Sequence, residues 1–215
     1  DTLKATMRRS RITTAWMTAP LFNQILDADI HVFAGLKNLL VGGDVLSPVH
    51  INRLRKKYPH LNIVNGYGPT ENTTFSTTYA VRREFEENIP IGKPIANSTA
   101  YIVDKYHNLV PTGIAGELWV GGDGVARGYM NNAELTLEKM ITNPFAPGDT
   151  VYKTGDLTRW LHGGDIEFLG RSDQQVKIRG YRIEPGEIEN HLLALDAVRE
   201  AVVIVREGNR QDKYL

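Results

Sequence analysis

The stretch that decides the fold is LKNLLVGGDVLSPVHINRLRKKYPHLNIVNGYGPT, which covers residues 36–70. It begins with an apolar run, Leu36–Val41, which predicts a strand buried on both faces and is followed by two glycines. Ser47 and Pro48 then predict a helix N-cap followed by proline at the first helical position. Apolar residues continue at helical spacing until Pro59, which ends the predicted helix.

A second strand, Leu61–Val64, follows this helix and completes a strand–helix–strand unit. Such units are parallel and right-handed, which predicts an α/β fold with a parallel-sheet subdomain. Asn65–Thr70 is then the turn that leaves the carboxyl end of the second strand. Because ligands of open α/β sheets bind outside that edge, we expect a binding site there.

The sequence pattern changes near Pro90, where short strands begin to alternate with glycine turns. One predicted helix, Ala133–Met140, interrupts these strands. The spacing predicts a β-barrel-like or sandwich-like subdomain packed on the first unit. The predicted strands are Thr99–Val103, Gly116–Val120, Val151–Thr154 and Ile166–Leu169.

The last part of the chain predicts the start of a small α+β domain. Val176–Ile183 is basic and rich in β-forming residues, and Pro185–Leu195 reads as a helix with acidic residues in its first turn. Val198–Val205 is predicted to be a closing strand. The expected parts are residues 1–97 (the C-terminal part of the parallel α/β subdomain), 98–172 (the β-barrel-like subdomain) and 173–215 (the start of a mobile C-terminal domain).

Composition argues against several classes of function. The formal net charge of the 215 residues is +0, so no charge excess favours nucleic acid or an anionic membrane as a partner. The lack of cysteine excludes disulfides, thiolate metal sites and cysteine nucleophiles, and it fits the reducing cytoplasm. No apolar run approaches the roughly 20 residues of a membrane span. Because the chain starts with Asp1 rather than Met, we expect it to be a piece of a longer polypeptide.

The segment Asn65–Asn72 (NGYGPTEN) carries the strongest chemical signal. Its glycines and proline fix a tight turn and let a ligand approach the main chain closely. Tyr67 can stack on a planar base, Thr70 can donate to a phosphate oxygen, and Glu71 can hold a hard divalent cation. The competing interpretation is a decorated turn that binds no ligand.

Other segments carry weaker signals. Within YKTGDL, Asp156 can accept from two ribose hydroxyls, or it is a turn aspartate bonded to its own backbone. Gly170–Arg182 carries four basic residues and is an anion-facing loop, a linker or a solvated hairpin. The glycines of Gly116–Gly122 and Val125–Tyr129 are interpreted as barrel corners and bulges. No histidine spacing typical of zinc and no Gly-x-Ser-x-Gly nucleophile motif occurs.

The chain resembles the adenylation domains of nonribosomal peptide synthetases in four consecutive segments: NGYGPTEN, GELWVGGDGVARGY, YKTGDL and GRSDQQVKIRGYRIEPGEIE. These domains belong to the adenylate-forming superfamily, together with acyl-CoA ligases and firefly luciferases. The resemblance covers essentially the whole chain and implies part of the adenylate-forming fold. It also implies a reaction in which ATP and an amino acid give an aminoacyl adenylate and pyrophosphate. The acyl group then passes to the phosphopantetheine thiol of a carrier domain.

The resemblance implies a role for each residue of the nucleotide-binding segment. Asn65 would bond the amino edge of adenine, Tyr67 would stack near the ring, and Gly66 would let the nucleotide approach the main chain. Thr70 would contact phosphate and act in catalysis together with Glu71. Glu71 would also coordinate Mg²⁺, the implied metal cofactor.

Later motifs imply further roles. Asp156 would take the ribose hydroxyls, with Arg171 beside the same ribose. Asp173 matches a hinge about which the small domain rotates between adenylation and thiolation. Lys177, expected to be catalytic, and Gly180 match a loop that faces the active site after that rotation.

The resemblance also implies the positions that line the amino-acid pocket. They correspond to Trp16, Leu40, Gly42, Gly66, Thr74 and Phe75. The glycines leave space, whereas the tryptophan, leucine and phenylalanine provide apolar walls. Because a charged substrate side chain would lack a partner there, we expect a hydrophobic, valine-like amino acid.

The chain departs from the family pattern at both ends. The glycine-rich phosphate loop and the aspartate that binds the substrate amine are expected upstream of Asp1, and the late catalytic lysine downstream of Leu215. We therefore expect little turnover from this stretch alone, with peptidyl carrier and condensation domains of the same assembly line as partners. The alternatives are an acyl- or aryl-CoA ligase, and a non-catalytic nucleotide-binding or interaction module.

Overall fold

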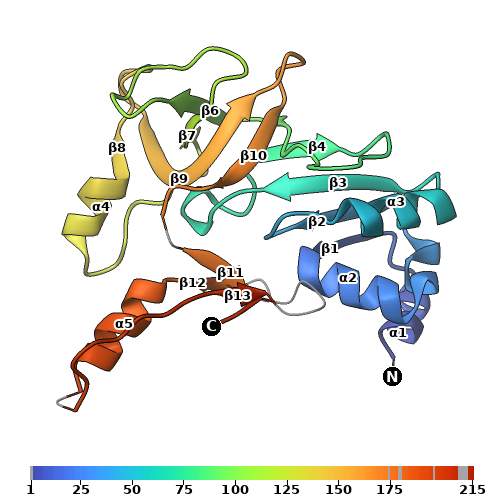
Figure 1. Cartoon of the computed structure of the whole chain (residues 1–215). Helices are drawn as coiled ribbons and strands as arrows, with labels where there is room; N and C mark the ends of the chain where they lie inside the picture. The colour runs from blue at the N-terminus through green and yellow to red at the C-terminus, as the bar shows by residue number, and fades with distance from the viewer. Residues whose placement is uncertain (1, 174, 179–180, 196, 208–212) are drawn as a thin grey trace. The chain divides into compact units, whose positions relative to one another are not determined.

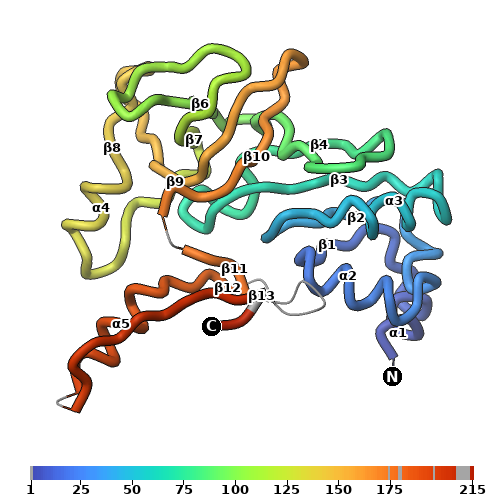
Figure 2. Tube along the Cα trace, viewed as in Figure 1, coloured from blue at the N-terminus to red at the C-terminus, as the bar shows by residue number. Residues whose placement is uncertain are grey.

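The chain divides into two compact units, residues 1–170 and residues 171–215. The computed structural model describes residues 2–173, 175–178, 181–195, 197–207 and 213–215. Figure 1 shows the helices and strands of both units, and Figure 2 follows the course of the chain through them.

A five-stranded sheet forms the first half of the first unit (Figure 1). In sheet order, its strands are β1 (Thr14–Thr18), β2 (Asn38–Gly42), β3 (Asn62–Tyr67), β4 (Thr77–Ala80) and β5 (Lys93–Pro94). The first three strands pair in parallel, whereas β4 and β5 are each antiparallel to the strand before them. The parallel strand–helix–strand unit predicted from the sequence is therefore confirmed.

Helices cover one face of this sheet. They are α1 (Leu3–Arg9), α2 (Ala19–Ala28), the 3-10 helix η1 (Ile30–Gly35) and α3 (Pro48–Lys57). Leu39 and Val41 of β2 share one buried core cluster with Phe22 of α2 and Leu54 of α3. Alternate residues of a strand point to opposite faces, so this register sends Leu39 and Val41 toward the helices.

The opposite face of the sheet is only partly covered, so the expectation of burial on both faces is wrong. Trp16 of β1 is 51% exposed, and its register partner Leu40 of β2 is half-buried. An apolar run does not distinguish a face packed under helices from an apolar face that is left open. This open face carries most of the predicted pocket residues.

Helix α3 begins at Pro48, as predicted. Ser47 occupies the N-cap position, but its side chain makes no capping hydrogen bond. Its Oγ instead lies 2.7 Å from Nδ1 of His50 in the first turn of the helix. The last residue of α3 is Lys57, just before the predicted stop.

The second half of the first unit is an open sheet rather than a closed barrel over the described residues. In sheet order, its strands are β10 (Ile166–Arg171), β9 (Thr150–Trp160), β7 (Gly116–Gly122) and β6 (Ser98–Val103), and β8 (Met140–Thr142) pairs with β9. All four predicted strands are present, and α4 (Ala133–Lys139) matches the predicted helix. A bridge between Gly92 and Ile166 joins this sheet to the first one.

The described part of the second unit contains a helix and short antiparallel strand pairs. The helix is α5 (Pro185–Leu193), and the pairs are β11 (Val176–Ile178) with β12 (Tyr181–Ile183) and β13 (Arg206–Glu207) with β14 (Lys213–Tyr214). The closing strand predicted at residues 198–205 is wrong, because this segment has no regular strand structure. Its Val202 and Ile204 side chains are 79% and 54% exposed, so the β-forming composition finds no partner strand among the described residues.

No helix in the described part of the chain is both long enough and apolar enough to cross a bilayer.

Candidate active site

The predicted nucleotide-binding residues start inside a strand rather than in a turn. Strand β3 continues to Tyr67, so the turn expected from Asn65 onward is wrong. Asn65 and Gly66 pair with β2 on one side and β4 on the other, which keeps the backbone extended. The chain leaves the sheet only afterwards and forms the 3-10 helix η2 (Thr70–Asn72).

A hydrogen bond joins the two motifs that the sequence assigned to one nucleotide. The hydroxyl of Tyr67 donates to Oδ2 of Asp156, so the end of β3 meets β9 (Figure 1). Both residues are buried, Tyr67 at 9% exposure and Asp156 at 7%. The structure thus brings together the Asn65–Asn72 motif and the YKTGDL motif.

A β-bulge places Asp156 in this position. The pairing of β7 with β9 shifts register between Glu117 and Trp119, and residues 154–156 of β9 fill the irregularity. Gly155 has φ 72°, a left-handed conformation that glycine adopts readily, and its N–H donates to Oε1 of Glu117 at 2.9 Å. The carboxylate therefore lies at a bulge within β9, which continues well beyond the strand predicted at Val151–Thr154.

Asn65 is oriented by the segment that precedes β5. Its side chain is 4% exposed, and Nδ2 donates to the carbonyl oxygen of Pro90 at 2.9 Å. An asparagine amide has one acceptor oxygen besides its NH₂ group, so Oδ1 is the atom that can accept from an adenine amino group. Thr70, by contrast, is exposed at the start of η2.

Glu71 is a buried carboxylate, 7% exposed, held by a tyrosine hydroxyl. Tyr129 donates to its Oε1 at 2.6 Å, and the hydroxyl oxygens of Tyr129 and Tyr152 lie 3.5 Å apart. Burial, followed by the bond to Glu71, raises the pKa of Tyr129, so its phenol stays protonated and remains a donor.

The surroundings of Glu71 decide which metal would fit. No group of three or more His, Cys, Asp or Glu side chains suited to a metal occurs in the described part of the chain. Mg²⁺ is commonly held by one or two carboxylates plus substrate phosphates and water. The buried carboxylate of Glu71, beside the predicted nucleotide-binding residues, therefore fits Mg²⁺ better than a metal that needs a full protein cage.

Five of the six predicted pocket residues gather on the open face of the first sheet. Trp16 is the register partner of Leu40, and Gly42 is the register partner of Gly66. The rings of Trp16 and Phe75 lie 6.4 Å apart, centroid to centroid. A Cβ atom added to Gly66 would come within 2.4 Å of Cε1 of Phe75, so this ring occupies the space above the glycine.

Thr74, the sixth pocket residue, lies in a strained piece of backbone. Thr73 and Thr74 have φ values of 39° and 63°, which β-branched residues rarely adopt. Strained backbone persists only where surrounding contacts hold it, and it is common at binding sites. Thr74 itself is exposed, and its contact with a substrate stays a prediction.

The remaining predicted site residues belong to the second unit. Arg171 donates to both carboxylate oxygens of Asp173, from Nε and from Nη2, each at 2.6 Å. Lys177 lies on β11, opposite Arg182 of β12, and Gly180 lies outside the described residues. Because the position of this unit relative to the first is not determined, the predicted ribose contact of Arg171 stays a prediction.

Tyr129 is not among the predicted site residues. The glycines around it are interpreted from the sequence as barrel corners, so nothing in that interpretation points to the Tyr129 side chain, which donates to Glu71. The one signal in the sequence is that Tyr129 closes GELWVGGDGVARGY, a core motif of the family resemblance.

Sequence comparisons show which proteins this chain is similar to. A sequence model described as "AMP-binding enzyme" matches residues 1–130. The chain is 59% identical over 209 residues to gramicidin S synthase 2 of Brevibacillus brevis, and 62% identical over 206 residues to tyrocidine synthase 3 of Brevibacillus parabrevis. These alignments cover 97% and 95% of this chain but only 5% and 3% of the two relatives.

Solved structures share the fold. Holo-PA1221, an NRPS protein containing adenylation and PCP domains bound to a vinylsulfonamide inhibitor, matches with TM-score 0.91 and 37% identity, over 98% of this chain and 37% of that one. NpsA-ThdA from Klebsiella oxytoca, an artificially fused adenylation-PCP di-domain, matches with TM-score 0.85 and 27% identity, over 98% and 39%. The predicted fold class and the predicted resemblance to nonribosomal peptide synthetase adenylation domains are confirmed. The chain therefore belongs to the family of AMP-binding enzymes.

Proposed function

We propose that this chain is part of a ligase that activates an amino acid with ATP in nonribosomal peptide synthesis. An oxygen of the amino-acid carboxylate attacks the α-phosphorus of ATP, the bond to pyrophosphate breaks, and an aminoacyl adenylate forms. A phosphopantetheine thiol then takes the acyl group and releases AMP. The observation that carries this proposal is the hydrogen bond between Tyr67 and Asp156, since it joins two motifs with complementary roles toward one nucleotide.

The end of β3 and the bulge in β9 bind the nucleoside part of ATP in this proposal. Oδ1 of Asn65 accepts from the adenine amino group, the ring of Tyr67 lies against the base, and Gly66 permits close approach of the nucleotide. Asp156 accepts from the ribose hydroxyls while Tyr67 holds its carboxylate in place. One tyrosine can serve both purposes, because its ring face and its hydroxyl contact different partners.

Thr70 and Glu71 serve the phosphate end. The Thr70 hydroxyl donates to a phosphate oxygen, and Glu71 helps to hold Mg²⁺, which neutralises phosphate charge when it is bound. The attacking carboxylate and the triphosphate are both anionic. Positioning and charge neutralisation are therefore the main contributions that these residues make to the rate.

The substrate is proposed to be a hydrophobic, valine-like amino acid. Support comes from the open sheet face, where Trp16, Leu40 and Phe75 present apolar surface and Gly42 and Gly66 present only backbone. None of these residues is charged, so a substrate lysine or glutamate would lose hydration without gaining a partner.

The second unit is proposed to rotate between the two steps. Support comes from the division of the chain between residues 170 and 171, two positions before the proposed hinge Asp173. Arg171 would approach the ribose, and Lys177 would face the active site in one orientation. Carrier and condensation domains are the proposed partners, since holo-PA1221 and NpsA-ThdA combine adenylation with PCP domains. The reducing cytoplasm, which suits a chain without cysteine, is the proposed location.

Amino-acid-dependent exchange of labelled pyrophosphate into ATP, measured on the intact natural protein, tests this function. We expect exchange to be strongest with small hydrophobic amino acids. Exchange driven only by fatty or aryl acids would identify a CoA ligase instead. Nucleotide binding without any exchange would identify a non-catalytic module, and a preference for lysine or glutamate would refute the proposed pocket.

A further inference from the structure

The loop after β7, residues 123–129, is fastened to the segment that carries Glu71. The N–H of Ala126 donates to the carbonyl oxygen of Glu71 at 2.8 Å. The hydroxyl of Thr73 donates to the carbonyl oxygen of Gly124 at 2.7 Å. The main chain at Glu71 and the side chain two residues later are therefore both bonded to one loop from the other half of the unit.

The same loop fixes the position of Tyr129. Its backbone N–H donates to Oγ1 of Thr136 at 2.9 Å, and that hydroxyl donates to the carbonyl oxygen of Asn132 at 2.8 Å. The ring of Tyr129 packs against the second core cluster, which includes Tyr67 and Tyr152. Both ends of the tyrosine are thus held before any ligand is present.

The hydroxyl of Tyr129 completes this arrangement by donating to Oε1 of Glu71 at 2.6 Å. A glutamate side chain loses considerable rotational freedom when it is fixed, and the terminal carboxylate bond is the softest of its torsions. A donor on Oε1 removes that freedom in the folded protein rather than at the moment of binding.

We propose that Tyr129 is a positioning residue that orients the Glu71 carboxylate toward a nucleotide-bound Mg²⁺. This inference rests on the proposed function, because it needs Glu71 to face a metal–nucleotide complex. It adds a residue from the loop 123–129 to a site that the sequence assigned to other motifs. Tyr129 touches neither the nucleotide nor the metal in this proposal, since it acts only through Glu71.

Tyr129→Phe tests the inference, because it removes one hydroxyl and keeps the ring. Binding of MgATP and of metal-free AMP to the intact natural protein is measured by isothermal titration calorimetry, which does not depend on turnover. We expect MgATP to bind about tenfold more weakly, as for the loss of a hydrogen bond to a charged group, whereas AMP binding changes less than about twofold. Thr136→Val, which removes the acceptor for the Tyr129 N–H, should weaken MgATP binding in the same selective way.

Two further variants separate positioning from general damage. Tyr101→Phe removes a hydroxyl of the same unit that accepts from Nδ2 of Asn143, and it should leave both affinities unchanged. In a Glu71→Gln background, Tyr129→Phe should add little further loss of MgATP affinity, because Tyr129 acts on MgATP only through the Glu71 carboxylate. Equal weakening of AMP and MgATP, or an unchanged MgATP affinity in Tyr129→Phe, would overturn the inference. Wild-type protein that binds AMP but shows no MgATP binding and no exchange would instead remove the proposed function, and the inference with it.

Discussion

Hydrogen bonds between buried polar groups hold the nucleotide end of the candidate site, whereas glycines, which have no side chain, leave space at the amino-acid end. At the nucleotide end, Asp156 accepts from Tyr67 and Glu71 accepts from Tyr129. Each carboxylate is held by a tyrosine from the other half of the first unit. The two halves of the unit therefore fix the positions of both carboxylates, and a shift of one half against the other would break these bonds.

Over the residues that the structure describes, the amino-acid end shows no comparable bond between side chains. Gly42 and Gly66 leave backbone bare, and the ring of Phe75 fills the space above Gly66. Shape decides what can bind on such a surface, and small changes of volume change the preference by modest factors. Substitutions at the nucleotide end should therefore lower the rate strongly, while those at the amino-acid end should alter stability or substrate choice.

Asp156→Asn should have the largest effect. It replaces a buried acceptor pair by an amide with one acceptor, so the ribose loses a charge-assisted hydrogen bond. We expect kcat/KM for ATP in pyrophosphate exchange to fall about 100-fold, comparable with the loss of one preorganised donor in other active sites. The preference for ATP over 2′-deoxy-ATP should shrink in the same variant.

Asp104→Asn is the matched control for this prediction. Asp104 is a turn aspartate of the same unit, and it accepts from the N–H groups of Tyr106 and Asn108. Its substitution should leave exchange unchanged. An Asp156→Asn variant that loses activity but discriminates 2′-deoxy-ATP as strongly as the wild type would show that Asp156 does not read the ribose.

Gly42→Ala should have the next largest effect, and on stability. A Cβ at Gly42 would come within 2.1 Å of the carbonyl oxygen of Gly66, so the backbone of two paired strands would have to separate. We expect the free energy of unfolding to fall by about 1–3 kcal/mol, as measured by urea denaturation. Gly35→Ala is the control, because its Cβ would meet nothing closer than 3.9 Å and should cost far less.

Gly66→Ala sharpens the contrast, because its new Cβ meets a side chain rather than backbone. The clash at 2.4 Å is with the ring of Phe75, which is half-buried and can rotate away. We expect KM for the preferred amino acid to rise about tenfold, with a smaller loss of stability than in Gly42→Ala. The double variant with Phe75→Leu should recover part of the affinity. Equal destabilisation by the two alanine variants, with unchanged KM, would contradict this picture.

The fold could be predicted wherever a local pattern determines the structure. The apolar periodicity of residues 36–64 and the position of Pro48 predict two strands and the helix between them correctly. The extension of β3 to Tyr67 and the bulge in β9 could not be predicted, since both depend on strands that are distant in the sequence. For the same reason, the β-forming residues 198–205 do not become a strand without a partner.

The candidate site divides along the same line. Residue chemistry and motif order make Asn65, Glu71 and Asp156 candidates, and their roles stay predictions. The structure shows that the two motifs meet, since Tyr67 contacts Asp156 across 89 residues of sequence. Tyr129 reaches Glu71 over 58 residues without any charge or unusual spacing to mark it. Tyr129 contacts Glu71 because the loop 123–129 is bonded to the segment that carries Glu71, and the sequence alone does not reveal those bonds.

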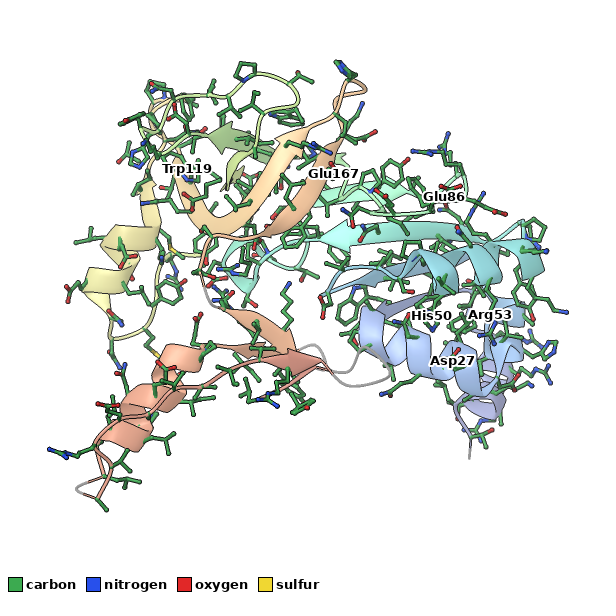
Figure 3. All side chains as sticks on the ribbon, in the orientation of Figure 1. Asp27, His50, Arg53, Glu86, Trp119 and Glu167 are labelled. Carbon is green, nitrogen blue, oxygen red and sulfur yellow. The ribbon has the colours of Figure 1, made fainter. Side chains whose placement is uncertain are left out.

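Asp27→Asn should have the smallest effect and provides a reference away from both ends of the site. Asp27 of α2 accepts from Nη1 of Arg53 at 2.8 Å and lies 3.3 Å from Nε2 of His50, both on α3 (Figure 3). The hydrogen bond with His50 is the main cause that lowers the pKa of Asp27, partly opposed by desolvation. Because the Asp27 side chain is 59% exposed, solvent screens these contacts, and the variant should lose less than about 1 kcal/mol of stability.

The pH dependence of this loss distinguishes an ion pair from simple packing. A carboxylate whose pKa is lowered on folding contributes stability above its unfolded pKa of about 3.9, and this contribution is lost as the pH falls through the folded pKa. Urea denaturation should therefore show a small difference between wild type and Asp27→Asn at pH 7, which shrinks as the pH falls below about 4 and disappears below the folded pKa. Pyrophosphate exchange at pH 7 should be the same in both proteins. If the difference in the free energy of unfolding instead grew at acid pH, the charge of Asp27 would not contribute to stability. Packing of the helices, rather than the ion pair between them, would then support the covered face of the sheet.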